Sequence, residues 1–266
     1  MKETATLERT KVSETNEEST RCVVLLSGGI DSTVLMYSLV ADYLIWPLTI
    51  SYGQRHNKEC IAARNVCEAR NHNLLLRHKH LNLSALKTLI HSALHGFGEI
   101  PEGHYTAESQ AATVSPNRNM IFLAVAAGYA QTIGAGYVAY AAHSNDRAIY
   151  PDCRPEFIRS VGETIKLGTG GEVELLEPFV NMTKADIVKL GKKLNVPFRL
   201  CWSCYKGEER PCLRCGTCVE RVEAFKLAGF PDPALTAEEW SRALEYLEGC
   251  ERGPSARIWG DAVDNL

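Results

Sequence analysis

Short apolar runs of the kind found in buried strands recur along the chain, and stretches of helical length separate them. The expected strands lie at 22–26, 48–52, 74–77, 137–141 and 173–176. The expected helices between them lie at 32–41, 57–71, 118–133, 155–166 and 183–194. Because strands that alternate with helices usually lie parallel, the pattern predicts an α/β fold with a doubly wound parallel sheet.

The length of 266 residues is long for one average domain and short for two. We expect an α/β domain over 21–200 and a helical segment over 201–266, with helices at 219–227 and 236–247. Residues 1–20 are polar, lack the apolar core of a secretion signal and are expected to be disordered. The aperiodic stretch 96–115 fits either a lid over a site or a plain surface insertion.

Charge and hydropathy limit the classes of partner. The 29 basic and 32 acidic residues give a net charge of −3, which disfavours strong nucleic-acid binding. The stretch 120–142 carries no charge and is long enough to span a bilayer. Gly134-Ala135-Gly136 interrupts it, so we read it as a buried helix followed by a strand, and we expect no membrane association and a cytoplasmic location.

A glycine-rich turn follows the first apolar run: Leu26-Ser27-Gly28-Gly29-Ile30-Asp31-Ser32-Thr33. The glycines let the backbone approach an anion, and the hydroxyl groups lie beside the amides of a helix N-terminus. The turn lacks the lysine of a Walker motif and the third glycine of the dinucleotide fingerprint. The Asp31 carboxylate would repel bound phosphates unless a divalent cation lay between them, which indicates Mg²⁺. Asp31 as a simple helix cap is the alternative.

Five of the ten cysteines fall within 201–218. Cys204, Cys212, Cys215 and Cys218 have the spacing of a closed tetrahedral zinc site, whose role would be structural. An iron–sulfur cluster and a redox pair are the alternatives, although the ferredoxin continuation is missing. Cys201 competes with Cys204 for one ligand position, and we assign that position to Cys204.

Further strings resemble a known family. The turn from Ser27 to Thr33 resembles the signature of the PP-loop ATP pyrophosphatases. The strings at 50–56, 115–119 and 150–157, with the cysteine cluster, are similar to the QueC family over about residues 21 to 227. That family usually has glycine where this chain has Asn117.

This resemblance implies a ligase that converts 7-carboxy-7-deazaguanine and ammonia into the nitrile 7-cyano-7-deazaguanine, using two ATP and releasing AMP and pyrophosphate. It implies a PP-loop domain, Mg²⁺ and one structural Zn²⁺ per chain, and we expect a homodimer. Three other functions stay open. They are a tRNA-modifying PP-loop enzyme, a QueC-like enzyme that joins a deazaguanine carboxylate to an amine on a macromolecule, and a nonenzymatic zinc module.

The resemblance and the charges also assign residues. The expected catalytic residues are Asp31, Arg118, Asp152 and Lys184. The expected ATP-binding residues are Leu26, Ser27, Gly28, Gly29, Ile30, Asp31, Ser32, Thr33, Tyr52, Gln54 and Arg55. The expected substrate-binding residues are Arg118, Asn119, Asp146, Asp152 and Arg154, with Asp152 reading the guanine-like edge. Cys153 as a nucleophile and His56 and His143 as proton shuttles are lesser alternatives.

Overall fold

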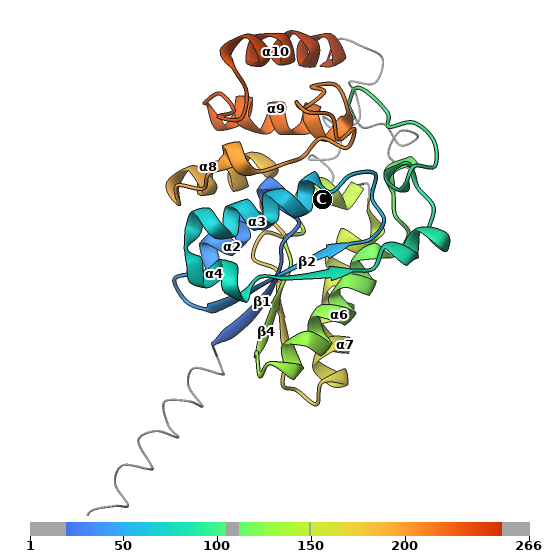
Figure 1. The fold of residues 1–266 in the computed structure, drawn as a ribbon, viewed down its shortest axis with the longest axis vertical. Coiled ribbons are helices and arrows are strands. Elements are labelled where there is room, and N and C mark those ends of the chain that lie inside the picture. Colours follow the sequence, from blue (N-terminus) through green and yellow to red (C-terminus); the bar gives the residue numbers. More distant parts are fainter. Residues whose placement is uncertain (1–19, 105–111, 149, 252–266) are drawn as a thin grey trace, which may run out of the picture.

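The computed structural model describes residues 20–104, 112–148 and 150–251. At its centre lies a five-stranded sheet with the order β3-β2-β1-β4-β5, and all four neighbouring pairs are parallel (Figure 1). The strands are β1 (Arg21–Leu25), β2 (Leu44–Ser51), β3 (Lys79–Asn82), β4 (Tyr137–Ala139) and β5 (Glu174–Leu176). The predicted extension over 1–20 lies outside the described residues except for Thr20, as does the end of the chain after residue 251.

Helices cover both faces of the sheet, which confirms the predicted doubly wound class. On one face lie α2 (Ile30–Leu39), α3 (Lys58–Arg70), α4 (His72–Arg77) and α8 (Lys184–Lys193). On the other lie α6 (Arg118–Thr132) and α7 (Pro155–Gly168) (Figure 1). Successive β1 residues point to opposite faces of the sheet. Cys22 and Val24 pack in the core beneath α2, α3 and α8, and Val23 packs in the core beneath α6 and α7.

The strand predicted at 74–77 is wrong, because these residues form the end of α4. Leu74 is buried whereas Leu76 is 65% exposed, and the Asn71 side chain caps the helix by accepting a hydrogen bond from the Leu74 amide at 2.7 Å. The third strand is instead the polar β3, at the edge of the sheet. An edge strand has only one neighbour and needs few apolar residues, so its sequence carried no apolar signal.

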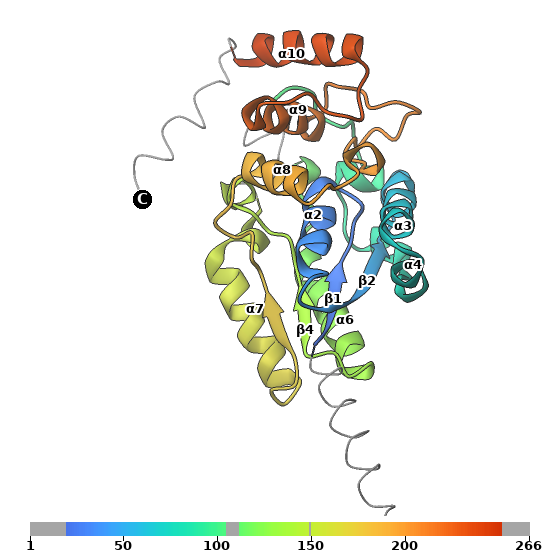
Figure 2. The same cartoon turned by 90° about the vertical axis from the view of Figure 1, so that its left-hand side faces the viewer.

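Two further helices stack outward beyond α8. Figures 1 and 2 show α9 (Gly216–Ala228) on α8 and α10 (Ala237–Glu251) on α9. Phe225 of α9 belongs to the same buried cluster as the residues of β1 and α2. Arg221 is also buried and pairs with Asp232, with Nε and Oδ2 at 2.6 Å, while its Nη1 donates to the carbonyl of Cys201 at 2.9 Å. The described part of 201–266 is therefore continuous with the core of the sheet domain.

The uncharged stretch 120–142 forms most of α6, a turn and β4, as predicted. In the part of the chain that the structure describes, no helix has both the length and the apolar character needed to cross a membrane.

Gly28 and Asn117 have left-handed backbones. Gly28, after β1, has φ of +87°, and a Cβ there would lie 2.3 Å from the carbonyl oxygen of Glu59. Only glycine allows the turn to pack this closely on α3. Asn117, directly before α6, has φ of 53° and ψ of 26°. Asparagine is among the few residues other than glycine that adopt this region readily.

Candidate active site

A cavity of about 240 Å³ opens at the carboxyl ends of the central strands. Sheet order reverses between β1 and β4, and ligands of open α/β sheets bind at such a reversal. The turn after β1, the end of β2, the start of α6 and the loop after β4 all reach the cavity. Lys184 and the segment 202–205 close it from the side of the C-terminal helices.

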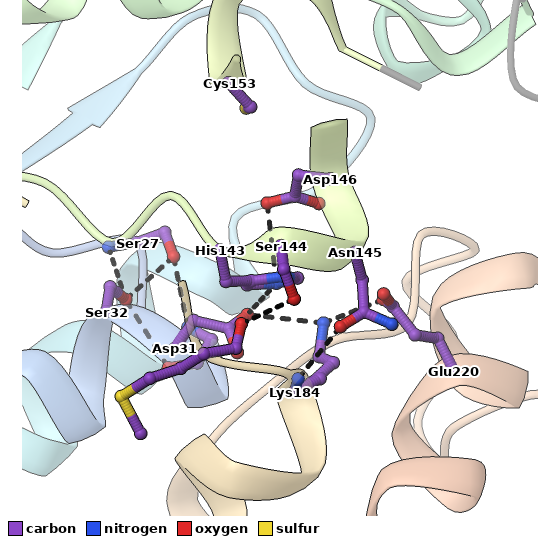
Figure 3. Close-up of polar contacts among 12 residues, drawn as sticks. Ser27, Asp31, Ser32, His143, Ser144, Asn145, Asp146, Cys153, Lys184 and Glu220 are labelled. Carbon is purple, nitrogen blue, oxygen red and sulfur yellow. Dashed lines mark hydrogen bonds and ion pairs between the residues drawn. The ribbon is translucent and has the colours of Figure 1, made fainter. Parts of the chain in front are cut away.

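The turn after β1 forms an anion cradle. The Ser27 and Ser32 hydroxyl oxygens lie 3.0 Å apart, the Gly29 amide donates to Ser27 Oγ at 3.2 Å, and Ser32 Oγ donates to the Gly29 carbonyl at 3.4 Å (Figure 3). Helix α2 begins at Ile30 with Gly29 as its N-cap and has no side-chain cap. Asp31 therefore is not the helix cap, and the N-terminus of α2 is left to face an anion.

Charged side chains from four segments converge beside this cradle (Figure 3). Lys184 Nζ lies 3.3 Å from Asp31 Oδ2 and 2.8 Å from Glu220 Oε2. His143 Nε2 lies 3.7 Å from Asp31 Oδ2 and 3.4 Å from Asp146 Oδ2. The two basic groups thus bridge three carboxylates inside one cavity.

The pKa values of this cluster follow from its pairing. Burial alone would raise the pKa of Asp31, but Lys184 and His143 outweigh it and hold that pKa well below its usual range. Burial would lower the pKa of His143, but the carboxylates of Asp146 and Asp31 raise it to about 9. Burial would also lower the pKa of Lys184, which Asp31 and Glu220 instead raise. At neutral pH, His143 and Lys184 are therefore both cations.

Asp31 fits the predicted role of a magnesium ligand. Its Oδ1 is buried and has no hydrogen-bond partner among the described residues. A free carboxylate oxygen beside an anion cradle is what Mg²⁺ bridging to phosphates requires. His143, Asp146 and Glu220 also bring ligand atoms within 4.8 Å of one another. In this structure Glu220 is paired with Lys184, and His143 lies between Asp146 and Asp31, so this second group forms a network of opposite charges.

The other end of the cavity is aromatic. Arg118 Nη1 donates to Tyr52 Oη at 3.0 Å, and its guanidinium lies 5.1 Å from the Tyr52 ring and 5.9 Å from the Phe122 ring. Tyr150 and Tyr205 line the same space. These side chains provide a cation and flat apolar faces for a planar heterocycle.

Most of the predicted site residues line this cavity. They are Leu26, Ser27, Gly29, Ile30, Asp31, Ser32, Tyr52, Gln54, Arg118, Asn119, Asp146 and Lys184. Gly28 and Thr33 belong to the same turn but are buried and do not line the cavity.

Three predicted residues lie away from the cavity lining. Arg55 is exposed and donates to the Gly98 carbonyl at 2.9 Å. Asp152 accepts a hydrogen bond from the Asn119 amide at 3.0 Å, so it caps the first turn of α6. Arg154 is exposed and donates to the Arg147 carbonyl at 3.2 Å.

The cavity also contains side chains that the sequence did not single out, notably Glu59, Tyr205, Thr217 and Glu220. Glu59 stands in the first turn of the helix after β2, which is where the chain leaves the carboxyl end of a parallel strand. Glu220 follows the last clustered cysteine by two residues. Both positions are visible in the sequence, but their approach to the cavity depends on how α3 and α9 pack.

Cys153 lines the cavity as a neutral thiol. Its Sγ lies 3.1 Å from Tyr140 Oη and 3.4 Å from Asn119 Nδ2. Burial raises its pKa, and the neighbouring Asp146 raises it further. A nucleophilic thiolate is therefore disfavoured at this position.

The four clustered cysteines are grouped closely enough to hold a metal ion. The sulfurs of Cys204, Cys212, Cys215 and Cys218 all lie within 4.8 Å of one another, with Cys212 and Cys218 at 3.9 Å. Zinc–sulfur bonds of about 2.3 Å in a tetrahedron require sulfurs about 3.8 Å apart. The amides of Cys212 and Cys215 donate to Cys204 Sγ at 3.4 Å and Cys212 Sγ at 3.3 Å, which would stabilise thiolates.

Cys201 stands apart from this group. It is buried in the core cluster with Val34 and Phe225. The structure thus groups Cys204 with the other three cysteines. Helix α9 begins at Gly216, between the last two of these cysteines, and carries Glu220 to Lys184. Helix α9 and the segment 202–205 therefore both connect the cysteine cluster to the cavity.

Comparison with known proteins agrees with this geometry. The family model described as "Queuosine biosynthesis protein QueC" matches residues 21–229. The chain is similar to a 7-cyano-7-deazaguanine synthase of Archaeoglobus fulgidus, at 49% identity over 86% of this chain and 95% of that protein. A synthase of the same name from Methanoregula boonei is 46% identical over 80% of this chain and 97% of its own.

Among solved structures, the NH3-dependent NAD synthetase of Campylobacter jejuni has a TM-score of 0.39 and 16% identity, over 92% of this chain and 90% of that chain, a likeness too distant to bear on function. The family match covers the strands, the anion cradle and all four clustered cysteines. The chain belongs to the QueC family.

Proposed function

We propose that this chain is a 7-cyano-7-deazaguanine synthase, an ATP-dependent ligase of queuosine-type biosynthesis. Its relatives at 46% and 49% identity carry that name. Its substrates would be 7-carboxy-7-deazaguanine, ammonia and ATP, and its products the nitrile, AMP and pyrophosphate. The observation that carries the proposal is one cavity with an anion cradle and Lys184 at one end and Arg118 among aromatic rings at the other.

The chemistry explains why such a cavity is needed. Ammonia does not displace an oxygen from a carboxylate at neutral pH, so that oxygen must first become part of a leaving group. Attack of the carboxylate on the α-phosphorus of ATP gives an acyl-adenylate and pyrophosphate. Ammonia then displaces AMP to give the amide with loss of a proton. A second adenylation, on the amide oxygen, releases pyrophosphate; AMP then leaves with that oxygen, both N–H protons of the amide are lost, and the nitrile forms.

The residues of the cavity have roles that fit these steps. Ser27, Gly29 and Ser32 would hold the pyrophosphate, next to the N-terminus of α2. Lys184 and protonated His143 would counter the negative charge that builds at the α-phosphorus. Arg118 would hold the reacting carboxylate or the adenylate oxygen. Mg²⁺ at Asp31 would neutralise phosphate charge.

The cysteine site would hold zinc. Four thiolates leave no open coordination position, so the ion would stabilise the fold of 204–218 and would not activate water. Homodimer formation and a cytoplasmic location stay predictions.

The test uses the full chain with ATP, Mg²⁺, ammonium and 7-carboxy-7-deazaguanine, followed by mass spectrometry. We expect nitrile as the product, two AMP per nitrile, and transient amide when ATP is limiting. Release of ADP and phosphate would contradict the adenylation chemistry. An adenylate that only hydrolyses until a protein or tRNA is added would favour the enzyme that modifies a macromolecule.

A further inference from the structure

The carboxylate of Glu59 faces the cavity without a donor. Glu59 lies in the first turn of α3 and lines the same space as Tyr52, Arg118 and Tyr205. Among the described residues, no amide or side chain donates a hydrogen bond to its carboxylate. Burial raises the pKa of Glu59 to about 7, although the Arg118 cation opposes the rise. The Glu59 side chain is partly buried, and its two acceptor oxygens stand at the cavity wall without a donor from the described residues.

A guanine-type edge has the donors that these oxygens lack. Its N1–H and 2-amino N–H lie side by side and point in the same direction, so one carboxylate can accept both. An adenine edge presents one donor beside one acceptor, which a carboxylate pairs with poorly. The rings of Tyr52, Phe122 and Tyr205 provide flat faces at this end of the cavity, where a bicyclic base can lie.

The other candidate for this role is already engaged. Asp152 lies outside the cavity lining, and its Oδ2 accepts from the Asn119 amide at 3.0 Å. Asp31 and Asp146 face Lys184 and His143 at the phosphate end. Among the carboxylates that line the cavity, Glu59 lies at the aromatic end and is free to accept hydrogen bonds from a base.

We propose that Glu59 is the residue that selects the deazaguanine base, by accepting hydrogen bonds from its N1–H and 2-amino group. This inference rests on the proposed function, because it takes the acceptor named there. Once the base is bound, the partly buried carboxylate gains the two donors it lacks. A base without the 2-amino group leaves one oxygen unpaired, which disfavours its binding.

The experiment measures binding by calorimetry, so it does not depend on turnover. The full chain is titrated with 7-carboxy-7-deazaguanine, with its analogue lacking the 2-amino group, and with ATP. For the wild type we expect the analogue to bind about 10- to 100-fold more weakly than the parent compound, as expected for loss of a hydrogen bond to a charged group. For Glu59→Gln we expect a similar loss of affinity for the parent compound, little discrimination between the two bases, and ATP affinity within twofold.

The matched control is Glu68→Gln, the same change at an exposed position of α3. It should leave all three affinities unchanged. Equal wild-type affinity for the two bases would overturn the proposal, and this measurement needs no variant. So would a Glu59→Gln variant that still discriminates between them, or one that loses ATP affinity as strongly as base affinity. Failure of the wild type to make nitrile while this binding pattern holds would instead count against the proposed function alone.

Discussion

The two oxygens of the Asp31 carboxylate have different surroundings. Oδ2 faces Lys184 and His143, whereas Oδ1 has no partner in the described part of the chain. Asp31→Asn keeps the shape of the side chain but removes the charge that a magnesium ion would need. We expect kcat to fall about 100-fold or more while the protein stays folded. Steady-state kinetics with circular dichroism would measure both.

The control for this change is Asp42→Asn, at an exposed turn beyond the end of α2. It should leave kcat unchanged. A fully active Asp31→Asn variant would remove the metal role from this carboxylate.

His143 makes stability depend on pH. Its pKa of about 9 lies above the value near 6.5 of an unfolded histidine, so folding favours the protonated form. This contribution is complete below about pH 6.5 and is lost as pH rises through about 9. We expect the gap in unfolding free energy between wild type and His143→Gln to narrow by up to about 3 kcal/mol from pH 6 to pH 9.5.

Urea denaturation at several pH values measures this gap. His72→Gln, at the exposed start of α4, is the matched control for the exchange of an imidazole for an amide. If the difference in unfolding free energy between wild type and His143→Gln stayed constant with pH, the carboxylate neighbours would not raise the pKa of this imidazole.

Sequence patterns located the residues of the site unevenly. The turn from Ser27 to Ser32 is contiguous, so its chemistry could be recognised before its geometry was known. Asp152 looked equally suitable by residue type, but its oxygen is taken up by a helix amide 33 positions away. Glu59 and Glu220 could not be ranked above other surface carboxylates, because only the packing of α3 and α9 brings them to the cavity.

At the scale of elements, α9 links the metal site to the phosphate end. Cys212→Ser removes one thiolate, and we expect the purified protein to lose most of its zinc and to melt at least about 5 °C lower, since closed thiolate sites contribute folding energy directly. Metal analysis and thermal melting test this. Cys201→Ser should retain the zinc, because Cys201 lies in the core cluster. Zinc loss in Cys201→Ser with zinc retained in Cys204→Ser would reverse the ligand assignment.

The same helix also positions Lys184. Glu220→Gln weakens the contact at 2.8 Å that holds the ammonium group beside Asp31, so we expect kcat to fall about tenfold with zinc content and melting temperature nearly unchanged. Enzyme assays on metal-replete protein measure the effect. Glu245→Gln, exposed on α10, is the control. A normal kcat for Glu220→Gln would limit α9 to a structural role.

The prediction of helices and strands failed where the apolar residues of a segment do not match its burial. The Leu74–Leu76 run belongs to a short helix with one buried and one exposed leucine, whereas β3 is mostly polar. The central strand β1 lies between two neighbours and under helices on both sides, so its apolar sequence predicted it well. Strand position in the sheet, which the local sequence does not contain, explains the difference.

At the scale of the whole molecule, we propose that the sheet domain and the described C-terminal helices unfold together. Phe225 and Cys201 share the core of the sheet domain, and the buried pair of Arg221 and Asp232 ties the turn after α9 to the segment before the cysteines. Asp232→Asn leaves a buried guanidinium without its counter-charge, at a cost of about 3 to 5 kcal/mol.

We therefore expect a single calorimetric transition in the wild type and a single, lower one in Asp232→Asn. Asp42→Asn again serves as the exposed control. Two separate transitions in the wild type would show that the C-terminal helices unfold independently of the sheet domain.

The left-handed backbone of Asn117 limits which residues can occupy this position. The dihedral angles of residue 117 set the start of α6, where Arg118 lines the cavity. Both glycine and asparagine can adopt these angles. Exchange of one for the other therefore keeps the path of the backbone before Arg118. A β-branched residue would meet a steric penalty of about 1 to 2 kcal/mol at the same angles. Among homologues, drift at this site should therefore stay within the small group of residues that tolerate a positive φ.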